Sequence, residues 1–143
     1  MISLPNRFRL GILTVAIILF AVSVTEAYDV DTSYNSGIGI YMVDEGGRTL
    51  YYFDEDNPKE SNVDDGEWSP FDAGDLDDIR LPSDLNRRDF DRISRGSGKF
   101  QTTYRGWPLY LYLNRGPGDI SGDDRYVDGG LMHVAYPTME QCK

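Results

Sequence analysis

Short apolar runs separated by turn residues predict antiparallel strands along most of the chain. In the first half, Gly37 to Val43 is apolar and β-branched, and Thr49 to Phe53 is a second apolar run. Glu45-Gly46-Gly47 lies between them, and glycine adopts positive φ at little steric cost. The three segments together predict a β-hairpin.

The second half of the chain shows the same order of elements. Phe100 to Tyr104 predicts a strand, Arg105-Gly106 a turn and Pro108 to Leu113 a partner strand. The segment from Leu131 to Tyr136 is expected to be the closing strand.

A shift of 59 residues aligns the segment from Gly47 with the segment from Gly106, and it places Pro58 on Pro117. An isolated hairpin is only marginally stable, so this internal repetition predicts two copies that pack together to form a core.

The connecting region is polar. Asn57 to Asp78 is expected to be a long loop, with Trp68 and Phe71 folded back as apolar anchors. One short helix is expected after it, capped by Ser83 or Asp84. Its apolar residues fall near helical spacing, and these are Leu85, Phe90 and Ile93.

These elements predict an all-β fold. We expect two tandem hairpin-type repeats that form one small antiparallel sheet or sandwich, with one short helix between them. The single domain would span residues 28–143, with repeat one at about 37–78, the helical linker at about 79–98 and repeat two at about 99–137.

Residues 1–27 have the pattern of a signal peptide. Arg7 and Arg9 precede an apolar stretch from Leu10 to Val24, and the segment ends at Ala27. The apolar stretch has about 15 residues, which is short for a membrane span of roughly 20. Cleavage after Ala27 is therefore expected, in preference to an uncleaved anchor. The mature chain would be periplasmic or extracellular, with no membrane span.

The charge is concentrated in one region. The chain has a net charge of −10, and Asp44 to Asp78 holds 13 acidic and 2 basic residues. Such a surface repels nucleic acid and anionic lipid and attracts cations, a basic surface or a basic envelope protein. The same composition is also typical of a solvated loop.

The aromatic strands resemble a family of short secreted bacterial repeats, described as predicted lipoproteins with a Y-x-[FWY]-x-x-D motif. Tyr51, Phe53 and Asp56 match this motif completely, whereas Tyr110 and Tyr112 match its aromatic part and are followed by Arg115 in the place of Asp. Gln101 to Tyr110 is similar to the family's Q-x-T-Y-x-G-x-P-L-Y stretch, Pro117-Gly-Asp119 to its P-G-D loop, and Met132-His-Val134 to its closing W-H-V.

The resemblance covers roughly Ile38 to Pro137 and implies secretion and a β-rich repeat fold, without an established activity. The chain departs from the family in three ways: it has no lipid-attachment cysteine, it lacks a cysteine pair in the first loop, and Met132 replaces Trp. The first departure favours a form that is not lipid-anchored. The only cysteine, Cys142, is expected to be a free thiol on a frayed tail or a cross-link between two chains.

The only histidine, His133, excludes a site built from several imidazoles of one chain. It is expected to be a structural hydrogen-bond partner or one metal ligand, beside Met132, Met139 or carboxylates, for copper or haem iron.

Two acidic groups suit weak calcium binding. The first comprises Asp54, Asp56, Asp64, Asp65 and Glu67, and the second, weaker group comprises Asp119, Asp123 and Asp124. The candidate metal ligands are therefore His133, Asp54 and Asp56.

The motif aromatics Tyr51, Phe53, Tyr110 and Tyr112 allow two interpretations, a core between the repeats or an exposed strip for a glycan or protein. The core is favoured, because so small a chain needs its aromatic residues inside. No nucleophile and base are evident as a pair, so an enzyme is not expected. The sequence favours an exported, non-catalytic binding or scaffold module of the bacterial cell envelope, with no bound cofactor. The alternative is a small periplasmic metal- or haem-binding protein that uses His133 as one ligand.

Overall fold

A computed structural model describes residues 2–3, 16–18, 27–63 and 66–143, and within these residues the regular structure is almost all strand. The expected all-β class is confirmed. The strands are β1 (Val30–Asn35), β2 (Gly39–Asp44), β3 (Leu50–Phe53), β4 (Trp68–Pro70), β5 (Phe90–Gly96), β6 (Lys99–Tyr104), β7 (Trp107–Pro108), β8 (Tyr110–Tyr112), β9 (Arg125–Val127) and β10 (Gly130–Val134). Two single turns of 3₁₀ helix, η1 (Leu76–Asp78) and η2 (Arg87–Asp89), complete the set.

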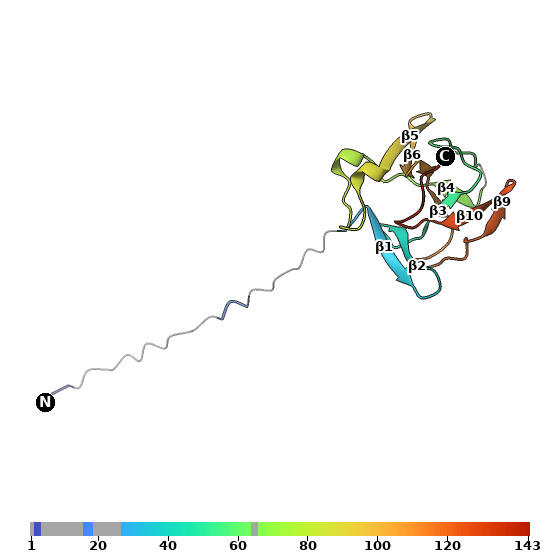
Figure 1. The fold of residues 1–143 in the computed structure, drawn as a ribbon. Coiled ribbons are helices and arrows are strands. Elements are labelled where there is room, and N and C mark those ends of the chain that lie inside the picture. The colour runs from blue at the N-terminus through green and yellow to red at the C-terminus, as the bar shows by residue number, and fades with distance from the viewer. Residues whose placement is uncertain (1, 4–15, 19–26, 64–65) are drawn as a thin grey trace.

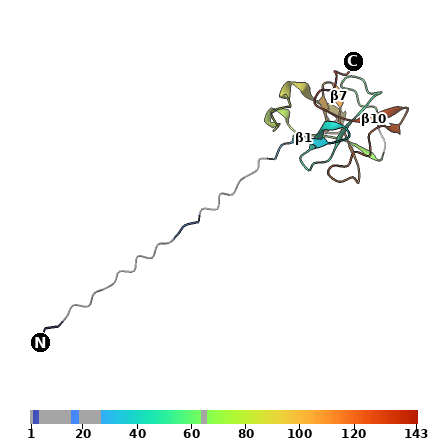
Figure 2. The same cartoon turned by 60° about the horizontal axis from the view of Figure 1, so that its bottom comes forward.

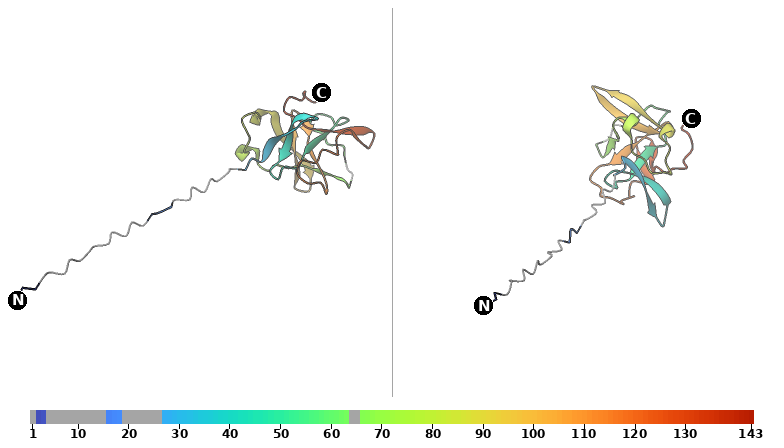
Figure 3. Two further views of the ribbon diagram at one scale, coloured as in Figure 1. Left: turned by 90° about the horizontal axis from the view of Figure 1, so that it is seen from below. Right: turned by 90° about the vertical axis from the view of Figure 1, so that its left-hand side faces the viewer.

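A curved five-stranded sheet lies at the centre, with strand order β4-β8-β3-β10-β9 and antiparallel pairing throughout. Two antiparallel hairpins flank it. The β1–β2 hairpin lies at one end of the molecule, and the β5–β6 hairpin, to which β7 is added, lies at the other end (Figures 1 and 3).

The central sheet is paired symmetrically about Tyr51 of β3 and Tyr110 of β8, which face each other. On one side of this pair Ser69 lies opposite Leu111 of β8, and on the other side His133 lies opposite Tyr52 of β3. The pairing is therefore two-fold symmetric. If β3 and β8 change places, β4 takes the position of β10, and Ser69 takes the position of His133. β4 of the first half of the chain thus pairs with β8 of the second half, and β10 of the second half pairs with β3 of the first.

Backbone hydrogen bonds continue this symmetry outside the sheet. Phe71 N–H donates to Leu109 at 2.9 Å, and Ala135 N–H donates to Leu50 at 2.8 Å. Lys59 N–H donates to Gly106 at 2.9 Å, and Gly118 N–H donates to Gly47 at 3.2 Å. The last two acceptors, Gly47 and Gly106, have φ of +80° and +83°. Glycine fits both turns because it tolerates positive φ without steric cost.

The first predicted hairpin has the wrong partner strand, and the second is correct only near its turn. The runs 37–43 and 49–53 do form β2 and β3, but they share only the isolated bridge between Val43 and Thr49. β2 pairs along its length with β1, a segment that is polar in sequence. In the second half, β7 ends at Pro108, and the chain then leaves β6 for the central sheet. The predicted turn at residues 45–47 is therefore a crossing between two sheets, whereas Arg105-Gly106 is a hairpin turn between β6 and β7, as predicted, and the crossing follows at Leu109.

The short helix predicted in the linker at about 79–98 is also wrong. Only η2 is helical there, with the side chain of Asn86 accepting the Arg88 N–H at its start. Phe90 and Ile93 belong to β5 and pair with Tyr104 and Gln101 of β6. The expected loop at 57–78 likewise contains β4 and η1, although Trp68 and Phe71 are buried as predicted.

The central sheet separates two apolar clusters, because successive side chains of a strand point to opposite faces. Tyr51, Phe53, Tyr110 and Tyr112 lie in one cluster and are at most 4% exposed. Trp68 stacks on Tyr112 with centroids 4.3 Å apart. The motif aromatics are therefore core and do not form an exposed strip. The other cluster contains Leu50, Leu109 and Leu111 together with residues of both hairpins.

The C-terminal tail is docked, which corrects the expectation of a frayed end (Figure 2). Trp107 of β7 donates its indole N–H to the carbonyl of Glu140 at 3.0 Å, and Cys142 N–H donates to Arg105 at 2.9 Å. The Cys142 side chain is buried beside Gly106. Burial also raises the pKa of its thiol, so Cys142 is not presented as a cross-linking site.

Most of the expected signal peptide, residues 1, 4–15 and 19–26, lies outside the described residues. Within the described part of the chain, no helix has the length and apolar character needed to cross a membrane.

Candidate functional site

His133 lies in β10 with its imidazole between two carboxylates. Nε2 is 3.2 Å from Oδ2 of Asp54, which directly follows β3, and Nδ1 is 3.1 Å from Oδ1 of Asp124. The ring of Tyr52 lies beside the imidazole, with centroids 5.4 Å apart. Both nitrogens of the single imidazole therefore face a carboxylate oxygen.

The loop before β9 brings Asp123 and Asp124 to this imidazole. Met132 pairs with Arg125, so the residues that precede Arg125 lie alongside His133. Oδ1 of Asp123 accepts the backbone N–H of Val134 at 3.0 Å, which fixes that carboxylate. One nitrogen of His133 and one oxygen from each of the two aspartates lie within 4.8 Å of one another. We call these three residues the His–Asp cluster.

The His–Asp cluster opens into a cavity of about 390 Å³. Burial, and to a smaller degree the neighbouring Tyr136, Asp123 and other acids, raise the pKa of Tyr52 to about 12, so its hydroxyl is neutral at physiological pH. The remaining wall is largely apolar and aromatic and is formed by Ile38, Ile40, Tyr41, Val134 and Tyr136. The cavity therefore combines charged ligand atoms with apolar surface.

This arrangement suits a metal ion because a metal-ligating histidine usually donates its second ring N–H to a carboxylate. In the tautomer with Nε2 protonated, Nε2–H donates to Asp54, and the lone pair of Nδ1 lies beside Asp124. The geometry thus supports a metal ion at this position.

Of the three predicted ligands, the structure brings His133 and Asp54 together and places Asp56 elsewhere. The first acidic group does not converge within the described residues, because Asp54 contacts His133 while Glu67 lies 4.0 Å from Arg125. Asp64 and Asp65 lie outside the described residues. The predicted methionine partners are also absent from the cluster, since Met132 and Met139 are buried in the two apolar clusters.

Asp56, the last residue of the motif, is buried in a polar network between the two halves. Its Oδ2 accepts the hydroxyl of Tyr110 at 2.7 Å, and its Oδ1 accepts the Asn62 N–H at 2.7 Å. The Tyr110 hydroxyl also contacts Ser61, which accepts a hydrogen bond from Arg95. Burial raises the pKa of Asp56 to about 6, against the lowering effect of these hydrogen bonds. The first motif therefore uses its aspartate to hold the tyrosine of the second.

The contact between His133 and the Asp123–Asp124 pair was not foreseen from the sequence, which assigned the aspartates to a separate acidic group. A signal was present in Asp128-Gly129. Both residues have positive φ, and they join β9 to β10 as a two-residue hairpin loop. An Asp-Gly loop of this kind predicts a tight hairpin, and that hairpin places residues 123 and 124 beside His133.

Comparisons with known proteins do not identify a relative. No family model, no curated protein and no solved structure matches the chain.

Proposed function

We propose that the protein is an exported, non-catalytic binding module of the cell envelope that takes a divalent transition-metal ion at the His–Asp cluster. The convergence of one imidazole nitrogen and two carboxylate oxygens within 4.8 Å carries this proposal. An imidazole combined with carboxylates suits Zn²⁺, Cu²⁺ or Ni²⁺. Calcium is disfavoured, because it takes six to eight oxygen ligands. The open side of the cluster faces the cavity, where water or a partner's side chain completes the coordination.

A binding role accounts for the surroundings of the cluster. Tyr52 lies beside the imidazole, and its raised pKa keeps its hydroxyl protonated and therefore a poor base or nucleophile. Asp54 is engaged with His133 and with the backbone N–H of Leu131. These groups hold the imidazole in place, and none of them is poised to react.

Export rests on the signal-peptide pattern of residues 1–27 and on the resemblance to secreted repeats. We expect the mature protein to begin at Tyr28. Intact-mass spectrometry of protein expressed with its own leader checks this expectation. A mature, membrane-bound protein that retains residues 1–27 would contradict both cleavage and release.

Zn²⁺ is expected to raise the melting temperature of the protein when a polyhistidine tag has been removed, because a ligand of the native state stabilises it by mass action. His133 is the only histidine, so its ring nitrogens give unique NMR signals. We expect the Nδ1 resonance to move on addition of Zn²⁺, while Nε2 stays protonated. Unchanged imidazole resonances at millimolar Zn²⁺ would refute metal binding.

A matched pair of variants tests the ligand assignment. Asp124 and Asp128 both have positive φ, +58° and +44°, a conformation that asparagine accepts readily. Asp124→Asn should abolish the effect of Zn²⁺, whereas Asp128→Asn should leave it intact. Asp54→Asn should weaken Zn²⁺ binding by about 10–100-fold, as loss of a hydrogen-bond partner of a metal-bound histidine does. Equal losses in Asp124→Asn and Asp128→Asn would show that binding is diffuse.

A further inference from the structure

The symmetric pairing of the central sheet creates a second groove in the position that corresponds to the cavity of His133. The exchange of β3 with β8 places Ser69 and Pro70 of β4 on His133 and Val134 of β10. Thr102 N–H donates to Phe71 at 2.7 Å, and Met42 N–H donates to Ala135 at 2.8 Å, so the hairpins are attached equivalently.

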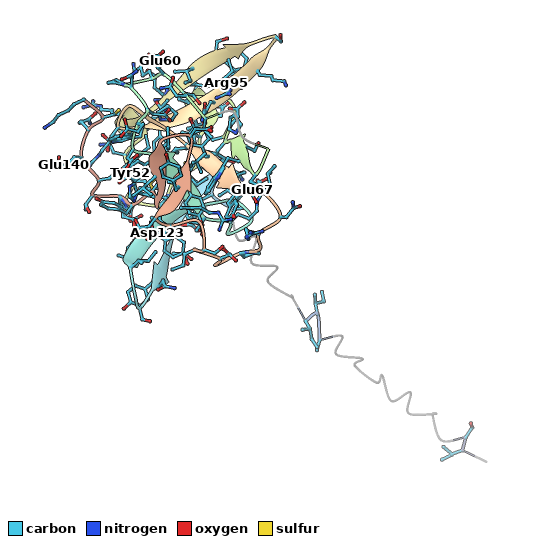
Figure 4. The ribbon with its side chains drawn as sticks, turned by 90° about the vertical axis from the view of Figure 1, so that its right-hand side faces the viewer. Tyr52, Glu60, Glu67, Arg95, Asp123 and Glu140 are labelled. Atoms are coloured by element: carbon cyan, nitrogen blue, oxygen red, sulfur yellow. The ribbon has the colours of Figure 1, made fainter. Side chains whose placement is uncertain are left out.

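The second groove has the same construction as the first. Phe100 lies two residues before Thr102, as Ile40 lies two residues before Met42. Phe100 and Ser69 line the groove between β4 and the β5–β6 hairpin, and Ile40 and His133 line the cavity between β10 and the β1–β2 hairpin. Figure 4 shows Arg95 near the first of these hairpins and Asp123 near the second, toward opposite ends of the molecule.

The charges of the two grooves are opposite. The cavity of His133 contains Asp123 and Asp124, whereas the second groove, of about 700 Å³, contains Arg92, Arg95 and Lys99. It holds one acid, Asp72, and this carboxylate is already paired with Arg92 through two hydrogen bonds of 2.8 and 2.9 Å. We call this site the basic groove.

Two cations of the basic groove, Arg95 and Lys99, form no direct ion pair among the described residues, although Arg95 also interacts electrostatically with the buried carboxylate of Asp56. Arg95 donates through Nη1 to Ser61 and to Gln101, which are both uncharged. Lys99 is exposed and forms no ion pair within residues 27–63 and 66–143. The guanidinium of Arg92 lies 4.1 Å from the ring centroid of Phe100. This cation–π contact holds the two side chains together in the lining of the groove.

We propose that the basic groove binds a small ligand that carries an oxyanion group, a phosphate or a carboxylate, between Arg95 and Lys99. Arginine and lysine are the side chains that recognise such groups. The net charge of −10 does not prevent binding, because at physiological ionic strength charges more than about 8 Å away are largely screened. The two corresponding grooves of one fold thus take ligands of opposite charge.

Amide chemical shifts in ¹⁵N-labelled protein that has been stripped of metal with EDTA and then dialysed free of EDTA test this proposal without any contribution from metal. Inorganic phosphate and galacturonate are titrated separately, with sodium chloride at matched ionic strength and galactose as controls. We expect localised shifts at Arg95, Lys99 and Phe100 with phosphate, with galacturonate or with both, and their pattern distinguishes a free phosphate from an acidic sugar. Shifts that chloride reproduces, or no shifts with either anion, would overturn the proposal.

Lys99→Gln should weaken binding of the responding anion about three- to five-fold, as expected for the loss of one exposed charge contact. Lys99 is exposed at the end of β6, and its side chain forms no ion pair among the described residues, so this variant should fold normally. Arg88→Gln removes the same charge outside the groove and should leave the affinity unchanged. Equal weakening in the two variants would show that the anion responds to overall charge only.

Discussion

Replacing Phe53 by alanine is expected to lower the free energy of unfolding by about 3–5 kcal/mol, the range found for a large aromatic removed from a core. The Phe53 side chain is 2% exposed, and a Cβ placed on Gly130 would lie 2.7 Å from its ring, so it is tightly enclosed. A domain of this size has only about 5–15 kcal/mol of stability in total. Thermal and denaturant melts of the variant should therefore show severe destabilisation.

Tyr112→Ala should have a similar effect, because Tyr112 stacks on Trp68 and is also buried. Tyr126 provides the control: it is 72% exposed, and Tyr126→Ala should change the stability by less than about 0.5 kcal/mol. A melting temperature of Phe53→Ala within about 2 °C of wild type would contradict the core assignment, since each kcal/mol shifts it by roughly 4–8 °C in a small domain.

The core aromatics could be predicted because alternation along a strand is a local property. Tyr51 and Phe53 lie two residues apart, so they point to the same face whichever strand is their partner. The partner itself is not local. Gly37 to Val43 and Thr49 to Phe53 have the composition and the turn of a hairpin, yet β3 pairs with β8 and β10. The free energy gained by burying both faces of the central sheet is larger than the gain from pairing β3 with its neighbour in sequence, β2.

The predicted helix failed for a related reason. Leu85, Phe90 and Ile93 match helical spacing only approximately, and Phe90 points into the core from a strand. Pairing with β6 gives β5 the hydrogen bonds and the apolar contact that an isolated short helix would lack in water. A segment of this length has too weak a local preference to resist its tertiary surroundings.

At the candidate site, too, the sequence identifies the residue types but not which residues come together. His133 could be selected from the sequence because it is unique, and Asp54 because it belongs to an acidic group. Asp56, two residues later, was selected on the same ground, but it points away from His133 into the network with Tyr110. Composition identifies which residues can bind a cation, whereas only the registers of β9 and β3 on β10 decide which of them meet.

Asp56 leads to a prediction with a defined direction in pH. Its pKa is raised by burial from 3.8 to about 6 in the folded protein. Between these two values the folded state keeps a proton that the unfolded state has lost, so the unfolded state binds fewer protons and stability falls as the pH rises. The rise in the pKa of Asp56 from 3.8 to about 6 corresponds to about 3 kcal/mol in the free energy of unfolding. The free energy of unfolding, measured by urea titration, should decrease from pH 4 to pH 6 and then level off.

Asp56→Asn separates this effect from the other carboxylates. Asparagine has nearly the same shape and no charge, so the decrease between pH 4 and pH 6 should disappear. Asp72 and Asp91 act in the opposite direction, because hydrogen bonds from Arg92 and Lys59 lower their pKa values. The stability that they contribute is lost only as the pH falls below about 4, and this acid limb should remain in the variant. If wild type and Asp56→Asn show the same slope between pH 4 and pH 6, the buried carboxylate of Asp56 does not control the stability there.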